Sequence, residues 1–199
     1  MTNILLTRHG HVDNPARIFY GPDIHLSERG KQQILALAQD MKSAGKIPTR
    51  IIYSPYVRTT ESAMLFADTL DIVNISSDDR LVEWQVGDWY GKPLADFYAY
   101  TKYDQFPAYP LPPELEPLES CAMRVQQVLT EIVRDAPNET VLVVSHREPL
   151  ASAILTYQQK KLDTIRELEL PTASSWESSF ETTEKPSHLA LRFDRSSLD

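Results

Sequence analysis

Short apolar runs alternate with longer amphipathic segments along this chain, and this alternation limits the folds that it can adopt. The apolar runs predict strands at residues 3–7, 50–54, 72–75 and 140–145. Helical spacing of apolar residues predicts helices at about 27–44, with Ser27 as its cap, and at 57–70, 119–135 and 149–159. Continuously apolar strands separated by helices are typical of a mostly parallel sheet covered on both faces. The pattern therefore indicates an α/β fold whose ligand site lies beyond the carboxyl ends of the strands.

One segment, residues 96–117, does not follow this alternation. It contains six Tyr or Phe residues and five prolines, so it is too apolar for a disordered linker and too proline-rich for a regular helix. We expect an irregular insertion that forms either a satellite core cluster or a substrate lid. The rest of residues 1–199 is expected to form one domain with it, ending in a strand pair at 175–181 and 188–193.

Composition excludes several classes of function. The net charge of −8 repels nucleic acid phosphates, and no apolar run approaches the roughly 20 residues that span a bilayer. The N-terminus has neither the basic flank nor the cleavage site of a signal peptide, so we expect a cytoplasmic protein. Cys121 is the only cysteine, which rules out an internal disulfide framework and a cysteine-based zinc cluster.

The first predicted strand is followed directly by Arg8-His9-Gly10, three residues that could bind an anion. A guanidinium offers phosphate oxygens a planar fork of donors, and a neutral imidazole has a lone pair that can attack phosphorus. Gly10 allows a sharp backbone turn without side-chain bulk near the ligand. The tripeptide alone is weak support, because a surface turn can contain it by chance.

Two further strand ends carry similar residues. His146 follows the strongest strand and precedes a helix, where free N–H groups and the helix dipole attract an anion. Arg58 falls in the first turn of the helix after strand 50–54, although cations are unfavourable at that end of a helix. Its position indicates a bound anion or, alternatively, a pairing with Glu61.

A carboxyl group that could protonate a leaving alkoxide occurs at Glu83. Bulky apolar neighbours surround it in the sequence, and such surroundings raise the pKa of a carboxyl group. From spacing alone, three other carboxylates are equally good candidates: Glu61, Asp88 and Glu148.

Five motifs occur in order along about residues 3–155: Arg8-His9-Gly10, Leu26-Ser27-x-x-Gly30, Tyr53-Ser54-Pro-x-x-Arg58-Thr, Leu81-x-Glu83-x-x-x-Gly87-x-Trp89-x-Gly91 and Val144-Ser145-His146. This set resembles the histidine phosphatase, or phosphoglycerate-mutase-like, superfamily. The resemblance implies a three-layer α/β/α fold in which these motifs converge on one phosphate pocket. It also implies that His9 accepts the phosphoryl group, that Arg8, Arg58 and His146 hold it, and that Glu83 donates the proton.

The chain departs from the family pattern at three positions. Arg147 stands where the family usually has glycine, His11 where many members have glutamate or glutamine, and Asn14 is one residue earlier than an asparagine that often assists phosphate binding. We expect all three to affect substrate binding, so the departures concern the choice of substrate more than the reaction.

The reaction that this resemblance predicts is hydrolysis of a small phosphate monoester through a phosphohistidine on His9, with no metal and no cofactor. Glu83 would act first as an acid and then as a base, with an acidic-to-neutral optimum. A phosphomutase needs the same pocket, but mutases of this family tend to be longer and to enclose the site.

Two readings from other classes stay open. A noncatalytic protein that binds a phosphorylated ligand would keep the fold, and Arg147 and His11 are the hints for it. A metal site at His9-x-His11 has the right spacing in an extended strand, but Arg8 and Arg58 would repel a cation there.

Overall fold

A twisted five-stranded sheet forms the centre of the computed structural model, which describes residues 1–180. The strand order is β3-β2-β4-β1-β5, and all neighbours are parallel except β1 and β5. The strands are β1 (Thr2–Arg8), β2 (Arg50–Tyr53), β3 (Ile75–Ser77), β4 (Thr140–Ser145) and β5 (Ser175–Phe180). The mostly parallel sheet expected from the apolar runs is therefore confirmed.

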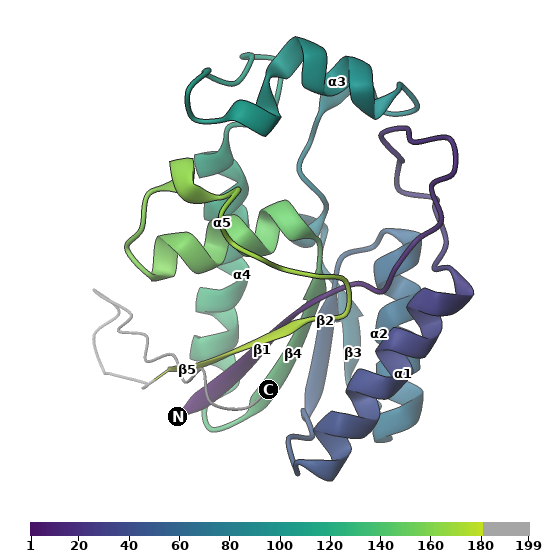
Figure 1. Cartoon of the computed structure of the whole chain (residues 1–199). Helices are drawn as coiled ribbons and strands as arrows, with labels where there is room; N and C mark the ends of the chain where they lie inside the picture. Colours follow the sequence, from purple (N-terminus) through teal and green to yellow (C-terminus); the bar gives the residue numbers. More distant parts are fainter. Residues whose placement is uncertain (181–199) are drawn as a thin grey trace.

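Helices cover both faces of this sheet, as Figure 1 shows. On one face lie α1 (Glu28–Ser43) and α2 (Val57–Leu70), and on the other lie α4 (Leu118–Asp135) and α5 (Arg147–Tyr157). A shorter helix, α3 (Leu94–Thr101), lies beyond the carboxyl ends of the strands. This is the three-layer α/β/α arrangement that the family resemblance implied.

The two helical layers explain why the strands are apolar throughout. Neighbouring side chains of a strand point to opposite faces. Leu5 and Leu142 join the hydrophobic cluster under α1 and α2, whereas Ile4 and Val143 join the cluster under α4 and α5. A strand with solvent on one face would instead alternate apolar and polar residues.

The connections from β1 and β4 leave toward opposite faces of the sheet, and the point at the carboxyl edge where they part is here called the crevice. These strands are neighbours, but β1 leads to α1 on one face and β4 leads to α5 on the other. Such a switch point is where open α/β sheets bind ligands. The register pairs Arg8 with Ser145, so the next residue of each strand, His9 and His146, reaches the crevice side by side.

The start of α1 is held closely against the loop that follows β1. Ser27 caps the helix by accepting a hydrogen bond from the Gly30 backbone N–H at 3.0 Å, as the sequence predicted. The Ser27 backbone N–H donates to the His11 carbonyl at 3.0 Å. At Gly30, a Cβ atom would overlap the His11 backbone. The motif Leu26-Ser27-x-x-Gly30 therefore positions the loop that carries His9.

Replacing Gly30 with alanine is expected to lower the free energy of unfolding by about 1–3 kcal/mol, because the added methyl group must displace the His11 backbone. The better helix propensity of alanine offsets only part of this cost. Urea unfolding of Gly30→Ala and wild type measures the difference. Gly21→Ala is the control, since nothing lies within 4 Å of a Cβ there. The packing argument would be contradicted if both variants lost the same free energy of unfolding, or if Gly30→Ala lost none.

The 96–117 segment is more regular than the sequence indicated. Residues 94–101 form α3, so the expectation of an irregular segment was wrong for this part. The reason is that the first proline of the segment is Pro107, which leaves the preceding residues able to form two helical turns. Phe97 and Tyr103 are buried with Trp84 in the core cluster under α4 and α5. The segment thus packs onto the main core rather than forming a separate one.

Two other expectations differ from the structure. The third strand begins at Ile75 rather than at residue 72, because the Ile72 backbone N–H still bonds to the Ala67 carbonyl at the end of α2. The expected strand at 188–193 lies outside the described residues, and the single domain over 1–199 stays a prediction. No helix in the described part of the chain is long and apolar enough to cross a membrane.

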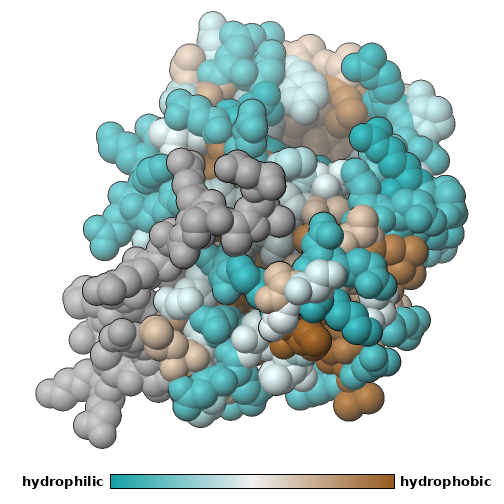
Figure 2. Space-filling view, turned by 60° about the horizontal axis from the view of Figure 1, so that its bottom comes forward, coloured by the Kyte–Doolittle hydropathy of each residue, from teal (hydrophilic) through white to brown (hydrophobic). Residues whose placement is uncertain are grey.

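Hydrophobic side chains on the face drawn in Figure 2 form small groups separated by hydrophilic ones, outside the grey atoms. Several large hydrophobic residues of the described chain are exposed, among them Ile47, Met64, Val73 and Met123. Scattered exposure of this kind is ordinary for a water-facing protein surface.

Candidate active site

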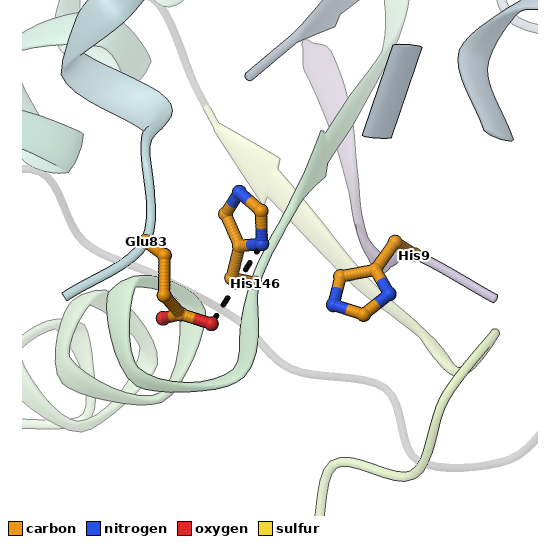
Figure 3. Close-up of side chains that lie close together, drawn as sticks. All are labelled: His9, Glu83 and His146. Atoms are coloured by element: carbon orange, nitrogen blue, oxygen red, sulfur yellow. Dashed lines mark ion pairs between the residues drawn. The ribbon is translucent and has the colours of Figure 1, made fainter. Parts of the chain in front are cut away.

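Side chains from three separate segments converge in the crevice between β1 and β4. His9 and His146 follow these strands, and Glu83 comes from the loop after β3 (Figure 3). The two imidazole centroids are 5.2 Å apart, with the ring planes inclined at 63°. One ligand atom from each of the three residues lies within 4.8 Å of the others. One small group bound there would touch all three.

The hydrogen bonds of His9 fix which ring nitrogen carries its lone pair. Nδ1 lies 2.7 Å from the Gly10 carbonyl oxygen, which can only accept, so Nδ1 carries the proton. Nε2 lies 3.2 Å from Nε of Arg58, which can only donate. The lone pair is therefore on Nε2, the nitrogen that faces the arginine.

Both histidines are held neutral. Burial, followed by the positive charges of Arg58 and Arg8, lowers the pKa of the His9 imidazole well below its ordinary value. Burial and Arg58 also lower the pKa of His146, whose Nε2 lies 2.8 Å from the Ser54 hydroxyl. A neutral His9 keeps its nucleophilic lone pair at neutral and mildly acidic pH.

Arg58 is fully buried in the first turn of α2. Its Nε donates to His9 and its Nη1 donates to the Gly21 carbonyl at 3.0 Å, while the Tyr20 and Tyr56 rings lie 5.0 and 5.2 Å from its Cζ. The alternative pairing with Glu61 does not occur. Glu61 instead accepts from the Leu26 backbone N–H at 2.7 Å and pairs with His25.

Three buried nitrogen atoms around the crevice have no hydrogen-bond partner among the described residues: Arg8 Nε, Arg58 Nη2 and His146 Nδ1. Buried donors are rarely left unpaired in folded proteins, and each one costs free energy. The α5 N-terminus, which begins at Arg147, adds its backbone N–H groups and positive dipole. This arrangement provides donors for an anion with several oxygens, such as a phosphoryl group.

The carboxyl group of Glu83 lies close to two of these nitrogens. Burial and the negative charge of Glu148 raise the pKa of Glu83 to about 7, although Arg58 acts in the opposite direction. Its Oε2 lies 3.7 Å from His146 Nδ1 and 3.9 Å from Arg58 Nη2. Of the carboxylates that spacing left open, Glu83 has an oxygen within 4.8 Å of both histidines, whereas Glu61 pairs with His25. The role of Glu83 as the proton donor stays a prediction.

Arg8 and Arg147 each contact backbone carbonyls of the segment after α5. Nη1 of Arg8 donates to the Leu170 carbonyl at 2.6 Å. Nη2 of Arg147 donates to the Ile165 and Leu168 carbonyls, both at 3.1 Å. These contacts make Arg147 a positioning residue for residues 165–168, and a substrate contact by its side chain stays a prediction.

His11 and Asn14 have local partners. Nδ1 of His11 lies 2.8 Å from the Ser27 hydroxyl, at the cap of α1. Both polar atoms of the Asn14 amide bond to the Ile18 backbone, at 2.8 and 3.1 Å. In this structure the two residues therefore stabilise loops beside the crevice, and their predicted contacts with substrate are not tested by it.

Sequence reasoning missed three residues of the site: Ser54, Tyr20 and Tyr56. Ser54 and Tyr56 lie within the motif that contains Arg58, so their position could have been noticed. Tyr20 lies in the loop after β1 and reaches Arg58 only through the folding of that loop. No spacing rule in the sequence indicates such a contact.

His9, Glu83 and His146 together have the ligand types and proximity that a transition metal requires. Arg58, with Nε 3.2 Å from His9 and Nη2 3.9 Å from Glu83, opposes a cation at this point. The alternative metal site at His9 and His11 finds no support, because Nδ1 of His11 lies 2.8 Å from the Ser27 hydroxyl. The electrostatics therefore favour an anion.

The fold and the site combine a mostly parallel α/β sheet with two buried, neutral histidines at the carboxyl ends of neighbouring strands. Residues 4–190 match the histidine phosphatase superfamily (branch 1). The chain belongs to this superfamily.

Its relatives include both phosphatases and mutases. The chain is 32% identical to phosphoserine phosphatase 1 of Hydrogenobacter thermophilus, over 75% of this chain and 73% of that protein. It is 25% identical to the 2,3-bisphosphoglycerate-dependent phosphoglycerate mutase of Streptomyces avermitilis, over 92% of this chain and 87% of the mutase. The solved structure of YhfR from Bacillus stearothermophilus has the same fold, with a TM-score of 0.83 and 24% identity over 98% and 96% of the two chains.

Proposed function

We propose that this chain hydrolyses small phosphate monoesters through a phosphohistidine on Nε2 of His9. The observation that carries the proposal is a set of buried nitrogens without a hydrogen-bond partner among the described residues, Arg8 Nε, Arg58 Nη2 and His146 Nδ1, near a neutral imidazole whose Nε2 lone pair accepts from Nε of Arg58. A phosphoryl group supplies the missing acceptors and places phosphorus at the nucleophile. Membership of a superfamily that includes phosphoserine phosphatase 1 supports the same chemistry.

In the first step, the phosphoryl oxygens bind Arg8, Arg58 and His146, and Nε2 of His9 attacks phosphorus. The N–P bond forms while the P–O bond to the alcohol breaks, and the electron pair of that bond stays on the alcohol oxygen. The protonated Glu83 carboxyl, next to the pocket, gives its proton to this oxygen. The arginines neutralise the charge of the transferring group, so positioning and electrostatics lower the barrier.

In the second step, a water molecule replaces the alcohol. The Glu83 carboxylate takes a proton from this water, and the water oxygen attacks phosphorus. The N–P bond breaks, and its electron pair returns to Nε2 of His9. Inorganic phosphate leaves, and Glu83 is protonated again, so the protein ends the cycle unchanged.

Arg8 and Arg58 occupy the place that a divalent cation has in metal-dependent phosphatases. Hydrolysis of p-nitrophenyl phosphate by this protein is therefore expected to proceed at the same rate, within twofold, in excess EDTA. The measurement follows nitrophenolate release at pH 5–7 with and without EDTA. Rates that fall with chelator and recover with one added metal would contradict this mechanism.

A phosphomutase would use the same phosphohistidine. The two reactions are separated by incubating 3-phosphoglycerate with the protein and a bisphosphoglycerate primer. Hydrolysis releases inorganic phosphate, whereas a mutase gives 2-phosphoglycerate without release. We expect release of phosphate.

A further inference from the structure

Glu83 lies on a segment of the chain that no regular secondary structure holds in place. Residues 83–86 follow the short turn at Asp79–Leu81 and belong to no helix or strand. A group that transfers a proton must be held closely, because a misplacement of about 1 Å can cost about 10²-fold in rate. The position of the Glu83 carboxyl therefore depends on contacts from other parts of the fold.

Side chains from α4 and β4 bind the backbone carbonyls of this segment. Arg124 of α4 donates to three of them: those of Arg80 and Val82, both at 2.7 Å from Nη1, and that of Glu83, at 3.1 Å from Nη2. The Ser145 hydroxyl, at the end of β4, donates to the remaining carbonyl, that of Leu81, at 2.7 Å. All four consecutive carbonyls from residue 80 to residue 83 thus accept a hydrogen bond from a side chain.

A carboxylate fixes the guanidinium of Arg124 in this position. Glu116, just before α4, accepts from Nε of Arg124 at 2.7 Å and from Nη2 at 3.0 Å, which makes the pair bidentate. The two side chains are only 16% and 13% exposed. Glu116 also accepts from the Gln85 backbone N–H at 3.0 Å. The pair therefore holds the chain both before and after Glu83.

The donors of Arg124 are used up by these contacts. Beyond the partners above, its hydrogen bonds in the described part of the chain include only one more, from Nη2 to the Cys121 sulfur at 3.3 Å. Every nitrogen of the guanidinium thus has a protein acceptor, so Arg124 has no donor left for a phosphoryl oxygen. Its contacts point to a role that acts through Glu83.

We propose that Arg124, paired with Glu116, is a positioning residue that holds the Glu83 carboxyl where it can protonate the departing oxygen. This inference rests on the proposed function, in which Glu83 is the acid. A residue that only stabilises the fold would affect all substrates alike. A residue that positions the acid matters most where the leaving oxygen needs a proton.

Phenyl phosphate and p-nitrophenyl phosphate separate these two roles, because they are similar in shape and phenolate is the more basic leaving group. The ester ratio is defined here as kcat/KM for phenyl phosphate divided by kcat/KM for p-nitrophenyl phosphate. Arg124→Lys keeps a positive charge beside Glu116, but its single nitrogen cannot replace the planar fork. We expect this variant to lower the ester ratio at least about fivefold. Both rates come from one sample, so the ratio does not depend on the fraction of protein that is folded.

Three further variants complete the experiment. Glu83→Gln gives the full effect of losing the acid. Glu116→Gln puts an amide N–H₂ group among the donors of Arg124 and Gln85, so it should lower the ester ratio in the same direction. Arg134→Lys is the matched control, because Arg134 is an exposed arginine of the same helix that pairs with Asp135, and it should keep the ratio within twofold.

The outcomes separate this inference from the proposed function. An unchanged ester ratio in Arg124→Lys, which includes equal loss on both esters, overturns the inference alone. If Arg124→Lys does not fold, an unchanged ratio in Glu116→Gln overturns it in the same way. A ratio that Arg134→Lys lowers as far as Arg124→Lys does also overturns it. If Glu83→Gln leaves the ratio unchanged, or wild type hydrolyses neither ester, the proposed function fails and this inference fails with it.

Discussion

Alanine in place of His9 is expected to lower kcat for p-nitrophenyl phosphate at least a thousandfold. The variant lacks the Nε2 lone pair that attacks phosphorus, and the other donors of the pocket cannot form a covalent intermediate. A thousandfold loss corresponds to about 4 kcal/mol of the activation barrier. In wild type, phosphohistidine should be trapped by rapid quenching in alkali, where the N–P bond survives, and His9→Ala should give none.

His25 supplies the matched control for this experiment. It is an exposed histidine that pairs with Glu61 outside the pocket, so His25→Ala should keep kcat within twofold. Thermal unfolding of both variants checks that the folded state persists. Turnover in folded His9→Ala close to that of wild type would show that another group attacks phosphorus, and it would exclude the mechanism proposed here.

Substitution of Glu83 by glutamine is expected to reduce hydrolysis of an alkyl phosphate by about 10²–10⁴-fold, the usual contribution of a positioned acid. Measured as kcat/KM, which reports formation of the phosphohistidine and not its hydrolysis, the loss should be much smaller for p-nitrophenyl phosphate, because nitrophenolate leaves readily without a proton. Leaving groups of graded basicity therefore measure how much protonation Glu83 supplies. An equal loss on all leaving groups would indicate that Glu83 positions the phosphate rather than donating a proton.

The same residue predicts a pH dependence whose direction follows from its pKa. Burial and Glu148 raise the pKa of Glu83 to about 7, so the acid form is present below this pH and is lost above it. Wild-type kcat/KM should therefore fall as the pH rises through about 7. Glu83→Gln should lack this fall. The ionisation of the substrate affects both proteins equally, so the difference between their pH profiles reports Glu83.

Glu148→Gln provides a second test of whether Glu83 causes the pH dependence. Removing the negative charge of Glu148 takes away one cause of the raised pKa of Glu83, so the alkaline limb should move to lower pH. If kcat/KM falls over the same pH range in Glu148→Gln and in Glu83→Gln as in wild type, a group other than Glu83 causes the fall.

The layers of the fold and the central residues of the site could be predicted because both depend on strands. Apolar runs such as residues 140–145 locate buried strands, and the residue that follows each strand must lie at the carboxyl edge of the sheet. This rule is enough to bring His9 and His146 to one place. The order of the strands adds that they are neighbours, since β4 lies beside β1.

What the sequence could not predict depends on loops. Tyr20 reaches Arg58 through backbone bonds between residues 18–19 and 91–93, which no periodicity encodes. Arg147 departs from the family pattern, but whether its side chain meets a ligand or a carbonyl depends on where residues 165–168 lie. The helix at 94–101 was obscured by prolines that all come after it.

The insertion of β4 between β1 and β2 has a consequence for how the protein is made. β1 and β2 both emerge early in synthesis, yet neither pairs with the other, because β4 fills the space between them. A nascent chain that ends before residue 140 therefore contains two central strands with unpaired edges and no site. The same strand pairs with both of these facing edges and is followed directly by His146, so His9 and His146 cannot come together before β4 has joined β1 and β2.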